Sequence, residues 1–280
     1  ALHRDGKLDD AAALYRAIPK GKPQHPDARH LLGMIACAQS RFEAALSDFD
    51  AAIAANGRAP DFHANRAFAL HGVGRWGDAA EAARRALKLK PDHPEAANTL
   101  GNALAAQADW AGAADAYRAA LKARADYAEA GANLGVALAA LGRDKEAAAW
   151  LRPALAALPA HGPAQGAWGD LRLKAGDAAG AAKRYTAQLA LHPANPAAWE
   201  ALGRARHQLD PADDRPPAVC WRRAARVAPL LPVSWAHWGS AARRAGDRLR
   251  TAQAFQTAAI LQPGDAGALS NLAMARRDLG

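Results

Sequence analysis

Residues 94–127 read PEAANTLGNALAAQADWAGAADAYRAALKARADY, and this 34-residue pattern recurs along most of the chain. A large residue at position 7 of the pattern (Leu100) precedes a small one at position 8 (Gly101). An aromatic residue stands at position 24 (Tyr117) and an alanine at position 27 (Ala120). Repetition at this period predicts a stacked array of small helical repeats rather than one globular core.

Positions 8 and 24 show the period most clearly. Position 8 is always small, and its occupants are Gly33, Ala67, Gly101, Gly135, Gly169, Gly203, Gly239 and Ala273. Position 24 is aromatic in most repeats, as Phe49, Tyr117, Tyr185, Trp221 and Phe255. Small residues allow two helices to approach closely, and large residues fill the space that remains. The pattern therefore predicts two packed helices in each repeat, which we call helix A and helix B.

Glycine and proline mark the ends of these helices. A glycine near position 15 separates helix A from helix B, and a proline near position 32 ends helix B. We divide residues 1–280 into a partial repeat at 1–25, full repeats at 26–59, 60–93, 94–127, 128–161, 162–195, 196–231 and 232–265, and a partial repeat at 266–280. The repeat 196–231 has two extra residues in its turn, and we expect 210–217 to protrude as a loop.

These positions resemble the tetratricopeptide repeat family, and the resemblance covers essentially the whole chain. The resemblance implies an all-α fold, a right-handed α-solenoid of about seven full helix-turn-helix repeats with partial repeats at both ends. It also implies an inner groove, lined by the A helices, that holds a peptide or a helix of a partner. Bacterial arrays of this type often precede a glycosyltransferase or sulfotransferase domain. Because Gly280 stands near the end of a helix A, we expect the chain to belong to a longer protein.

Charge and cysteine content limit the possible environments. The net charge is +9, and residues 196–280 hold 12 Arg, no Lys and 7 acidic residues. An Arg-rich end is compatible with nucleic acid or with acidic partners. The two cysteines, Cys37 and Cys220, lie many repeats apart and form no disulfide framework, which favours a reducing, cytoplasmic location. No apolar run approaches the ~18 residues of a membrane span.

The sequence shows no set of residues that would carry catalysis. It lacks a His-Glu-x-x-His, Cys-x-x-Cys, P-loop or Gly-x-Ser-x-Gly motif. His25, His93 and His161 share position 34 of separate repeats, so the stacking distance keeps them from binding one ion. We therefore expect no catalytic residues, no metal and no cofactor in this chain.

The resemblance assigns positions 2, 5, 6, 9, 12 and 13 of helix A to the groove. The candidate peptide-binding residues at these positions are Asn65, Phe68, His71, Asn98, Asn102, Asn133, Asp170, Lys174, Arg204, His207, Arg243, Arg244, Asn271 and Arg277. The groove is thus expected to change from apolar, through amide, to basic along the chain. The helix B arginines Arg222, Arg223 and Arg226 are expected to lie outside it.

Two subtypes of the family bear on the ligand. The subtype that clamps a C-terminal carboxylate needs Lys and Asn where this chain has His30 and Met34, so we do not expect a clamp. The subtype that precedes O-GlcNAc transferase domains carries Asn at position 6, which Asn65, Asn133 and Asn271 match while the other repeats do not. An Asn amide offers both a donor and an acceptor to a peptide backbone.

Three hypotheses follow. The first is a non-catalytic scaffold that binds a polypeptide segment in its concave groove. The second is the substrate-recruiting arm of a larger protein-modifying enzyme, such as a protein glycosyltransferase. The third, a nucleic-acid binder that uses the Arg-rich end, is disfavoured. We expect the partner to be a protein or peptide, acidic or rich in Ser and Thr, docked toward the C-terminal end. The sequence does not determine the oligomeric state.

Overall fold

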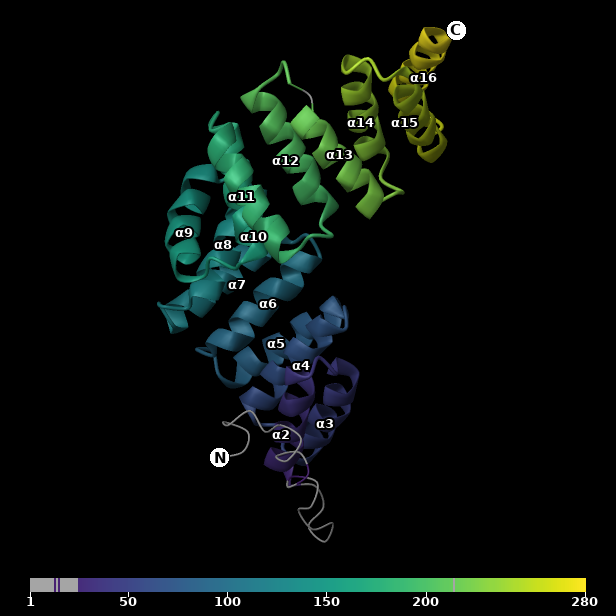
Figure 1. The fold of residues 1–280 in the computed structure, drawn as a ribbon. Helices are drawn as coiled ribbons and strands as arrows, with labels where there is room; N and C mark the ends of the chain where they lie inside the picture. Colours follow the sequence, from purple (N-terminus) through teal and green to yellow (C-terminus); the bar gives the residue numbers. More distant parts are fainter. Residues whose placement is uncertain (1–12, 14, 16–24, 214) are drawn as a thin grey trace. The chain divides into compact units, whose positions relative to one another are not determined.

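The computed structural model describes residues 13, 15, 25–213 and 215–280 (Figure 1). Within these residues the chain forms fifteen helices and no strand, which confirms the predicted all-α array of helix-turn-helix repeats. The A helices are α2 (Pro26–Ala38), α4 (Pro60–Gly72), α6 (Pro94–Ala106), α8 (Ala128–Ala140), α10 (Gly162–Lys174), α12 (Pro196–Leu209), α14 (Pro232–Arg244) and α16 (Ala266–Leu279). The B helices are α3 (Phe42–Ala55), α5 (Trp76–Leu89), α7 (Trp110–Ala123), α9 (Asp144–Ala157), α11 (Ala178–Leu191), α13 (Arg215–Val227) and α15 (Arg248–Leu261). Most of the predicted partial repeat 1–25 lies outside the described residues.

The helices group into two compact units, residues 1–150 (unit 1) and 151–280 (unit 2). In unit 1 the pairs α2–α3, α4–α5 and α6–α7 pack together, and the consecutive A helices from α2 to α8 also contact one another. In unit 2 the pairs α10–α11, α12–α13 and α14–α15 pack in the same way, and α16 packs on α15. A single superhelix over 1–280 stays a prediction.

The turn between helix A and helix B depends on one residue at position 15. That residue has a positive φ of 73° to 80° where it is glycine, namely at Gly74, Gly142, Gly176 and Gly246. Three repeats have no glycine there. In two of them Ser40 (φ 57°) and Ala108 (φ 62°) adopt the same left-handed conformation, whereas Asp210, in the repeat with the longer turn, has a φ of −142°. Since a side chain disfavours this region, the turn is strained in those two repeats.

The core is built from the contact between positions 8 and 24. A Cβ atom added to Gly33 would lie 2.5 Å from the ring of Phe49, and one added to Gly101 would lie 2.4 Å from the ring of Tyr117. The same contact joins Gly169 to Tyr185, Gly203 to Trp221 and Gly239 to Phe255. The aromatic ring of helix B therefore lies directly on the backbone of helix A in these repeats.

In several repeats the side chain at position 4 bonds to the end of the preceding repeat. Nε1 of Trp199 donates to the carbonyl oxygen of Pro193 at 2.9 Å, and Nε1 of Trp235 donates to that of Pro229 at 2.9 Å. Gln165 donates to the carbonyl of Pro159 at 2.7 Å in the same manner. In each case the acceptor lies at position 32, six residues earlier, so these side chains fasten the turn between repeats as well as packing.

The loop between α12 and α13 is shorter than the predicted loop 210–217. Helix α12 continues to Leu209 and α13 already begins at Arg215, so the described part of the loop is 210–213. The Asp210 carboxylate accepts hydrogen bonds from the backbone N–H groups of Ala212 and Asp213. Pro217 lies in the first turn of α13, where its missing N–H costs no helical hydrogen bond.

Candidate peptide-binding surface

The candidate residues lie on the A helices, and we call the surface that these helices present the A-helix face of each unit. It is formed by α2, α4, α6 and α8 in unit 1 and by α10, α12, α14 and α16 in unit 2. Residues three or four apart share one side of a helix, so positions 5, 6, 9, 12 and 13 lie near one another on this face.

Positions 5 and 6 join consecutive A helices. The amide nitrogen of Asn65 on α4 donates to Nε2 of His30 on α2 at 2.6 Å. On α14, Nδ1 of His237 donates to Oε2 of Glu200 on α12 at 2.7 Å. In both cases position 6 of one repeat bonds to position 5 of the repeat before it. These polar groups therefore hold helices together instead of pointing freely at a ligand.

The three central amides form one hydrogen-bonded cluster. Nδ2 of Asn133 donates to the side-chain oxygens of Asn98 at 3.2 Å and Asn102 at 3.0 Å. Asn98 is 3% exposed, and its own amide N–H groups donate to Tyr127 and Glu129. These three candidate peptide-binding amides thus bond to one another and to neighbouring side chains.

Tyr117 completes this cluster. Its hydroxyl donates to Oδ1 of Asn102 at 2.8 Å. Burial, together with the nearby charge of Glu129, raises the pKa of Tyr117, so the hydroxyl remains a donor at neutral pH. The tyrosine was predicted as a packing residue, and its second, polar role follows from the Asn at position 9 of the same repeat.

Phe68 gives the unit 1 face an exposed apolar surface. Phe68 is 50% exposed and meets Phe42 edge to face, with ring centroids 6.1 Å apart. Half-buried His71 lies one turn further along α4, and burial lowers its pKa, which favours the neutral imidazole. The predicted apolar character of this part of the face thus rests on Phe68 and on a histidine that is mostly uncharged at neutral pH.

In unit 2 a tyrosine–aspartate pair occupies positions 24 and 9 of its repeat, the positions that Tyr117 and Asn102 hold in unit 1. The hydroxyl of Tyr185 on α11 donates to Oδ1 of Asp170 on α10 at 2.7 Å. Burial and this carboxylate raise the pKa of Tyr185, while the positive charge of Arg204 acts in the opposite direction. Arg204 on α12 is therefore close enough to influence the pair, and its side chain is exposed.

The other basic candidates are exposed on successive A helices. Lys174 ends α10, Arg243 and Arg244 end α14, and Arg277 lies in the last turn of α16. The guanidinium of Arg243 lies 5.7 Å from the centroid of the Phe255 ring. These side chains give the A-helix face of unit 2 the basic character that the sequence predicts.

His207 and Asn271 are less exposed than the basic candidates. Both are half-buried, and the ring of His207 lies 6.1 Å from that of Trp221 on α13. Trp221 also lies 5.4 Å from the ring of His237. His207 therefore belongs to a packed aromatic layer between α12, α13 and α14 rather than to the exposed basic surface.

The described residues also restrict other kinds of site. Among the described residues, no group of three or more His, Cys, Asp or Glu side chains is arranged to hold a metal ion. Of the helices in the described chain, none combines the length and apolar character needed to span a membrane.

Solved structures share this fold at low sequence identity. A chain of the APC/C hetero-tetramer Cut9-Hcn1 matches with a TM-score of 0.72 and 14% identity, over 96% of this chain and 52% of that one. The C-terminal part of a repeat protein from Cytophaga hutchinsonii matches with a TM-score of 0.55 and 13% identity, over 86% and 98%. Yeast Tom70 matches with a TM-score of 0.51 and 12% identity, over 98% and 59%. This chain therefore spans about half of the first of these, and at such identities the likeness shows the fold alone.

Sequence comparison identifies the repeat itself. No curated protein is similar enough in sequence to match. The model of the tetratricopeptide repeat matches residues 30–94, 66–127, 98–161 and 167–213, which together make up more than half of the chain. The match follows the period, helix pairs and turns described above, and the chain therefore belongs to the tetratricopeptide repeat family.

Proposed function

We propose that the chain is a protein-interaction scaffold whose A-helix face in unit 2 binds an extended polypeptide segment that is acidic or rich in Ser and Thr. One observation carries the proposal. Arg204, Arg243 and Arg277 are exposed on three successive A helices, α12, α14 and α16. The polar groups at positions 5 and 6 are engaged between helices, so the arginines are the groups most available to a ligand.

Repetition makes this arrangement suitable for an extended partner. A solenoid presents equivalent positions at regular intervals, so one segment can meet a charge from each repeat in turn. Parallel contributions from several arginines raise the association rate and fix the orientation of an acidic segment. A charge-assisted hydrogen bond contributes ~1.5–3 kcal/mol when it is well made, and less where water and salt screen it.

The test compares two triple substitutions with equal loss of charge. The first variant carries Arg204→Ala, Arg243→Ala and Arg277→Ala on the A-helix face. The control carries Arg223→Ala, Arg226→Ala and Arg248→Ala, three exposed arginines of the B helices. Arg222 is left out of the control because it is half-buried and lines a pocket described below.

The probe is a fluorescein-labelled peptide of alternating Glu and Ser, and its affinity is measured by fluorescence anisotropy. We expect the A-helix triple to raise Kd at least about tenfold, since the loss of one good charged hydrogen bond suffices for that. The B-helix triple should change Kd by less than about threefold, because exposed charges act weakly through salt solution. If both triples weaken binding equally, net charge rather than the A-helix face explains the affinity and the proposal fails.

A further inference from the structure

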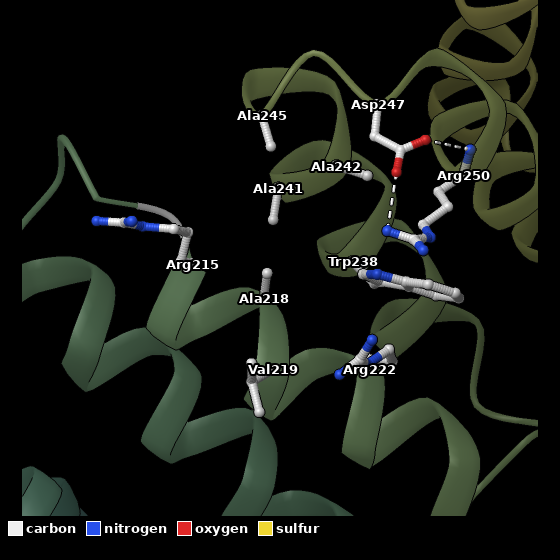
Figure 2. Close-up of a pocket in the computed structure, with 10 residues that line it drawn as sticks. All are labelled: Arg215, Ala218, Val219, Arg222, Trp238, Ala241, Ala242, Ala245, Asp247 and Arg250. Carbon is white, nitrogen blue, oxygen red and sulfur yellow. Dashed lines mark hydrogen bonds and ion pairs between the residues drawn. The ribbon is translucent and has the colours of Figure 1, made fainter.

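A small pocket opens in unit 2 where α13, α14 and the start of α15 meet (Figure 2). Its apolar lining consists of Ala218, Val219, Ala241, Ala242 and Ala245. Its volume is about 230 Å³, below the ~300–1,000 Å³ of sites that enclose a whole drug-sized ligand. The pocket therefore fits one large side chain better than it fits a complete cofactor or nucleotide.

Trp238 forms one wall and is held in place from behind. Its ring lies 5.5 Å from the ring of Trp235. Trp235 is fixed in turn, because its Nε1 donates to the carbonyl oxygen of Pro229 at 2.9 Å. Opposite this wall Val219 is 50% exposed at the base of the pocket. The fixed ring of Trp238 and the exposed side chain of Val219 form an apolar surface, which we call the apolar seat. Because Trp238 is already held in place, little side-chain entropy is lost when a ligand binds there.

The rim carries three guanidinium groups. Figure 2 shows Arg215 on one side of the opening, and Trp238, Arg222 and Arg250 on the other. Arg215 is paired with Asp213 at 2.8 Å, and Arg250 with Asp247 at 3.0 Å.

Arg222 differs from the other two. It is half-buried, and among the described residues it has no carboxylate partner. A guanidinium that no carboxylate neutralises favours the approach of an anion, because a charge-assisted hydrogen bond can form without displacing an existing partner. The pocket therefore combines an apolar seat with a positive rim.

The spacing of the rim arginines indicates the shape of the ligand. Arg215 and Arg222 are seven residues apart on α13, which corresponds to roughly 10 Å along the helix axis. An extended peptide advances about 3.3 Å per residue and its alternate side chains share one face, so carboxylates four residues apart lie on the same face about 13 Å apart, within reach of two long arginine side chains on α13. An apolar residue midway between those carboxylates shares that face and would lie over Val219.

We propose that this pocket binds an extended peptide segment in which two acidic residues four positions apart flank a large apolar residue. The apolar side chain enters the space between Val219 and Trp238. One carboxylate meets Arg222, and the other replaces Asp213 as the partner of the exposed Arg215. The site is formed by the side of α13 and α14 that faces the turn with the extra residues, and it uses none of the three arginines of the proposed A-helix site. It is therefore a second site, independent of the proposed function.

The test uses a labelled peptide with the core Asp-Ser-Leu-Ser-Asp between Gly-Ser flanks, and anisotropy as the measure of Kd. Arg222→Met keeps the apolar stem of the side chain and removes its charge. Arg223→Met, on the next residue of the same helix, is the matched control because Arg223 is exposed and does not line the pocket. We expect Arg222→Met to raise Kd about tenfold and Arg223→Met to change it less than about twofold. Equal effects, or no effect of either change, overturn the proposal.

Two altered peptides test the two parts of the recognition. Replacing Leu by Ser in the peptide should weaken binding about tenfold, because the apolar contact is lost. Replacing both Asp residues by Asn should weaken it at least as much. Unchanged affinity of either peptide refutes the corresponding half of the proposal, and tighter binding of an eight-nucleotide oligo-dT would assign the pocket to nucleic acid instead.

Two further variants complete the test. The first keeps the proposal testable if Arg222→Met impairs folding, and the second distinguishes the pocket from the A-helix face. Val219→Asp places a carboxylate in the exposed base of the pocket, so it should abolish binding even if Arg222→Met lowers the melting temperature. The triple Arg204→Ala, Arg243→Ala, Arg277→Ala should leave binding of this peptide within about twofold. Loss of binding in the triple with none in Val219→Asp would place the peptide on the A-helix face and overturn the pocket site.

Discussion

At the residue scale, the contact between positions 8 and 24 limits what each repeat tolerates. Phe49 is fully buried, and its ring leaves no room for a Cβ atom on Gly33. One repeat meets the same requirement differently. Ala67 and Ala83 replace the glycine and the aromatic residue, and both are fully buried. The two positions therefore act as a pair, in which a methyl group at position 8 is accommodated where the ring at position 24 is absent.

The pairing predicts a specific non-additivity. Gly33→Ala should destabilise by ~1–2 kcal/mol, because overpacking of ~1–3 kcal/mol outweighs the better helix propensity of alanine. Phe49→Ala should cost ~3–5 kcal/mol through the cavity it leaves. The double variant should cost at least ~1 kcal/mol less than the sum, since the new methyl group then has space. Urea denaturation measures all three.

Gly77→Ala serves as the control for this cycle. Gly77 lies in the first turn of α5, and a Cβ atom added there has nothing within 4 Å. That change should be neutral or stabilise by up to ~1 kcal/mol. Strict additivity of the Gly33 and Phe49 changes would show that the two residues do not compete for space.

Residue volumes can be interpreted from sequence more easily than polar partners can. The small and large positions follow directly from the period, and the structure places them in contact. The bonds of Asn65 to His30 and of His237 to Glu200 depend on the register between consecutive A helices. No pattern within one repeat reveals that register. A comparison of position 6 with position 5 of the preceding repeat would have suggested these pairs.

At the element scale, the A–B turn is strained where a residue other than glycine adopts the left-handed conformation at position 15. Ala108 has a φ of 62° and is exposed, so nothing but its own Cβ atom opposes the conformation. We expect Ala108→Gly to stabilise the protein by up to ~1 kcal/mol. The change removes the ~1–2 kcal/mol that the left-handed conformation costs alanine, and the greater entropy of glycine in the unfolded state offsets only part of this gain. Thermal melts of Ala108→Gly and of the opposite change, Gly142→Ala, should shift in opposite directions; shifts of the same sign would contradict the account.

Helix starts introduce a dependence on pH. The side chain of Asp177 caps α11, accepting from the backbone N–H of Gly180 at 2.8 Å and from Nε of Arg172 at 2.7 Å. The hydrogen bond from Gly180, and then that from Arg172, hold the pKa of Asp177 below its ordinary value. A lowered folded-state pKa means that this stabilisation is complete above the unfolded pKa of ~3.9 and is lost as the pH falls below it.

Asp177→Asn tests this dependence, since asparagine caps a helix about as well as aspartate but does not titrate. Between about pH 5 and pH 3 the melting temperature of the parent should fall more steeply than that of the variant. Parallel curves would mean that the Asp177 carboxylate does not contribute to the acid sensitivity.

At the scale of the whole molecule, contacts join helices that are neighbours in sequence. Apart from contacts between consecutive A helices, the helices from α2 to α8 and those from α10 to α16 pack on their neighbours in sequence. Stability in such an array is close to a sum of local terms, so a defect spreads little. In Gly33→Ala we expect faster amide hydrogen exchange in α2, α3 and α4, with exchange in α12–α16 unchanged. Uniformly faster exchange in every helix would show that the chain unfolds as one cooperative unit.

The sequence predicts the array better than it predicts the sites. The period alone yields the helix pairs, their turns and the all-α class, because every repeat supplies the same evidence again. The pocket beside Arg222 escaped because it arises where one repeat departs from the period, and its lining comes from three helices. The sequence assigned Arg222 and Arg223 together to the outside of the groove, whereas the structure makes one half-buried and the other exposed.

The bonds between positions 5 and 6 also have a mechanical consequence. In unit 2 the bond from His237 to Glu200 bridges α12 and α14, while Gly166 and Ala201 stand at the corresponding positions of α10 and α12. When an array of repeats is pulled along its length, its interfaces carry the same force in series. The interface between α10 and α12 should then yield at lower load than that between α12 and α14. The two residues at positions 5 and 6 thus set the mechanical resistance of each interface between A helices, and the interfaces of unit 2 should separate in a defined order under load.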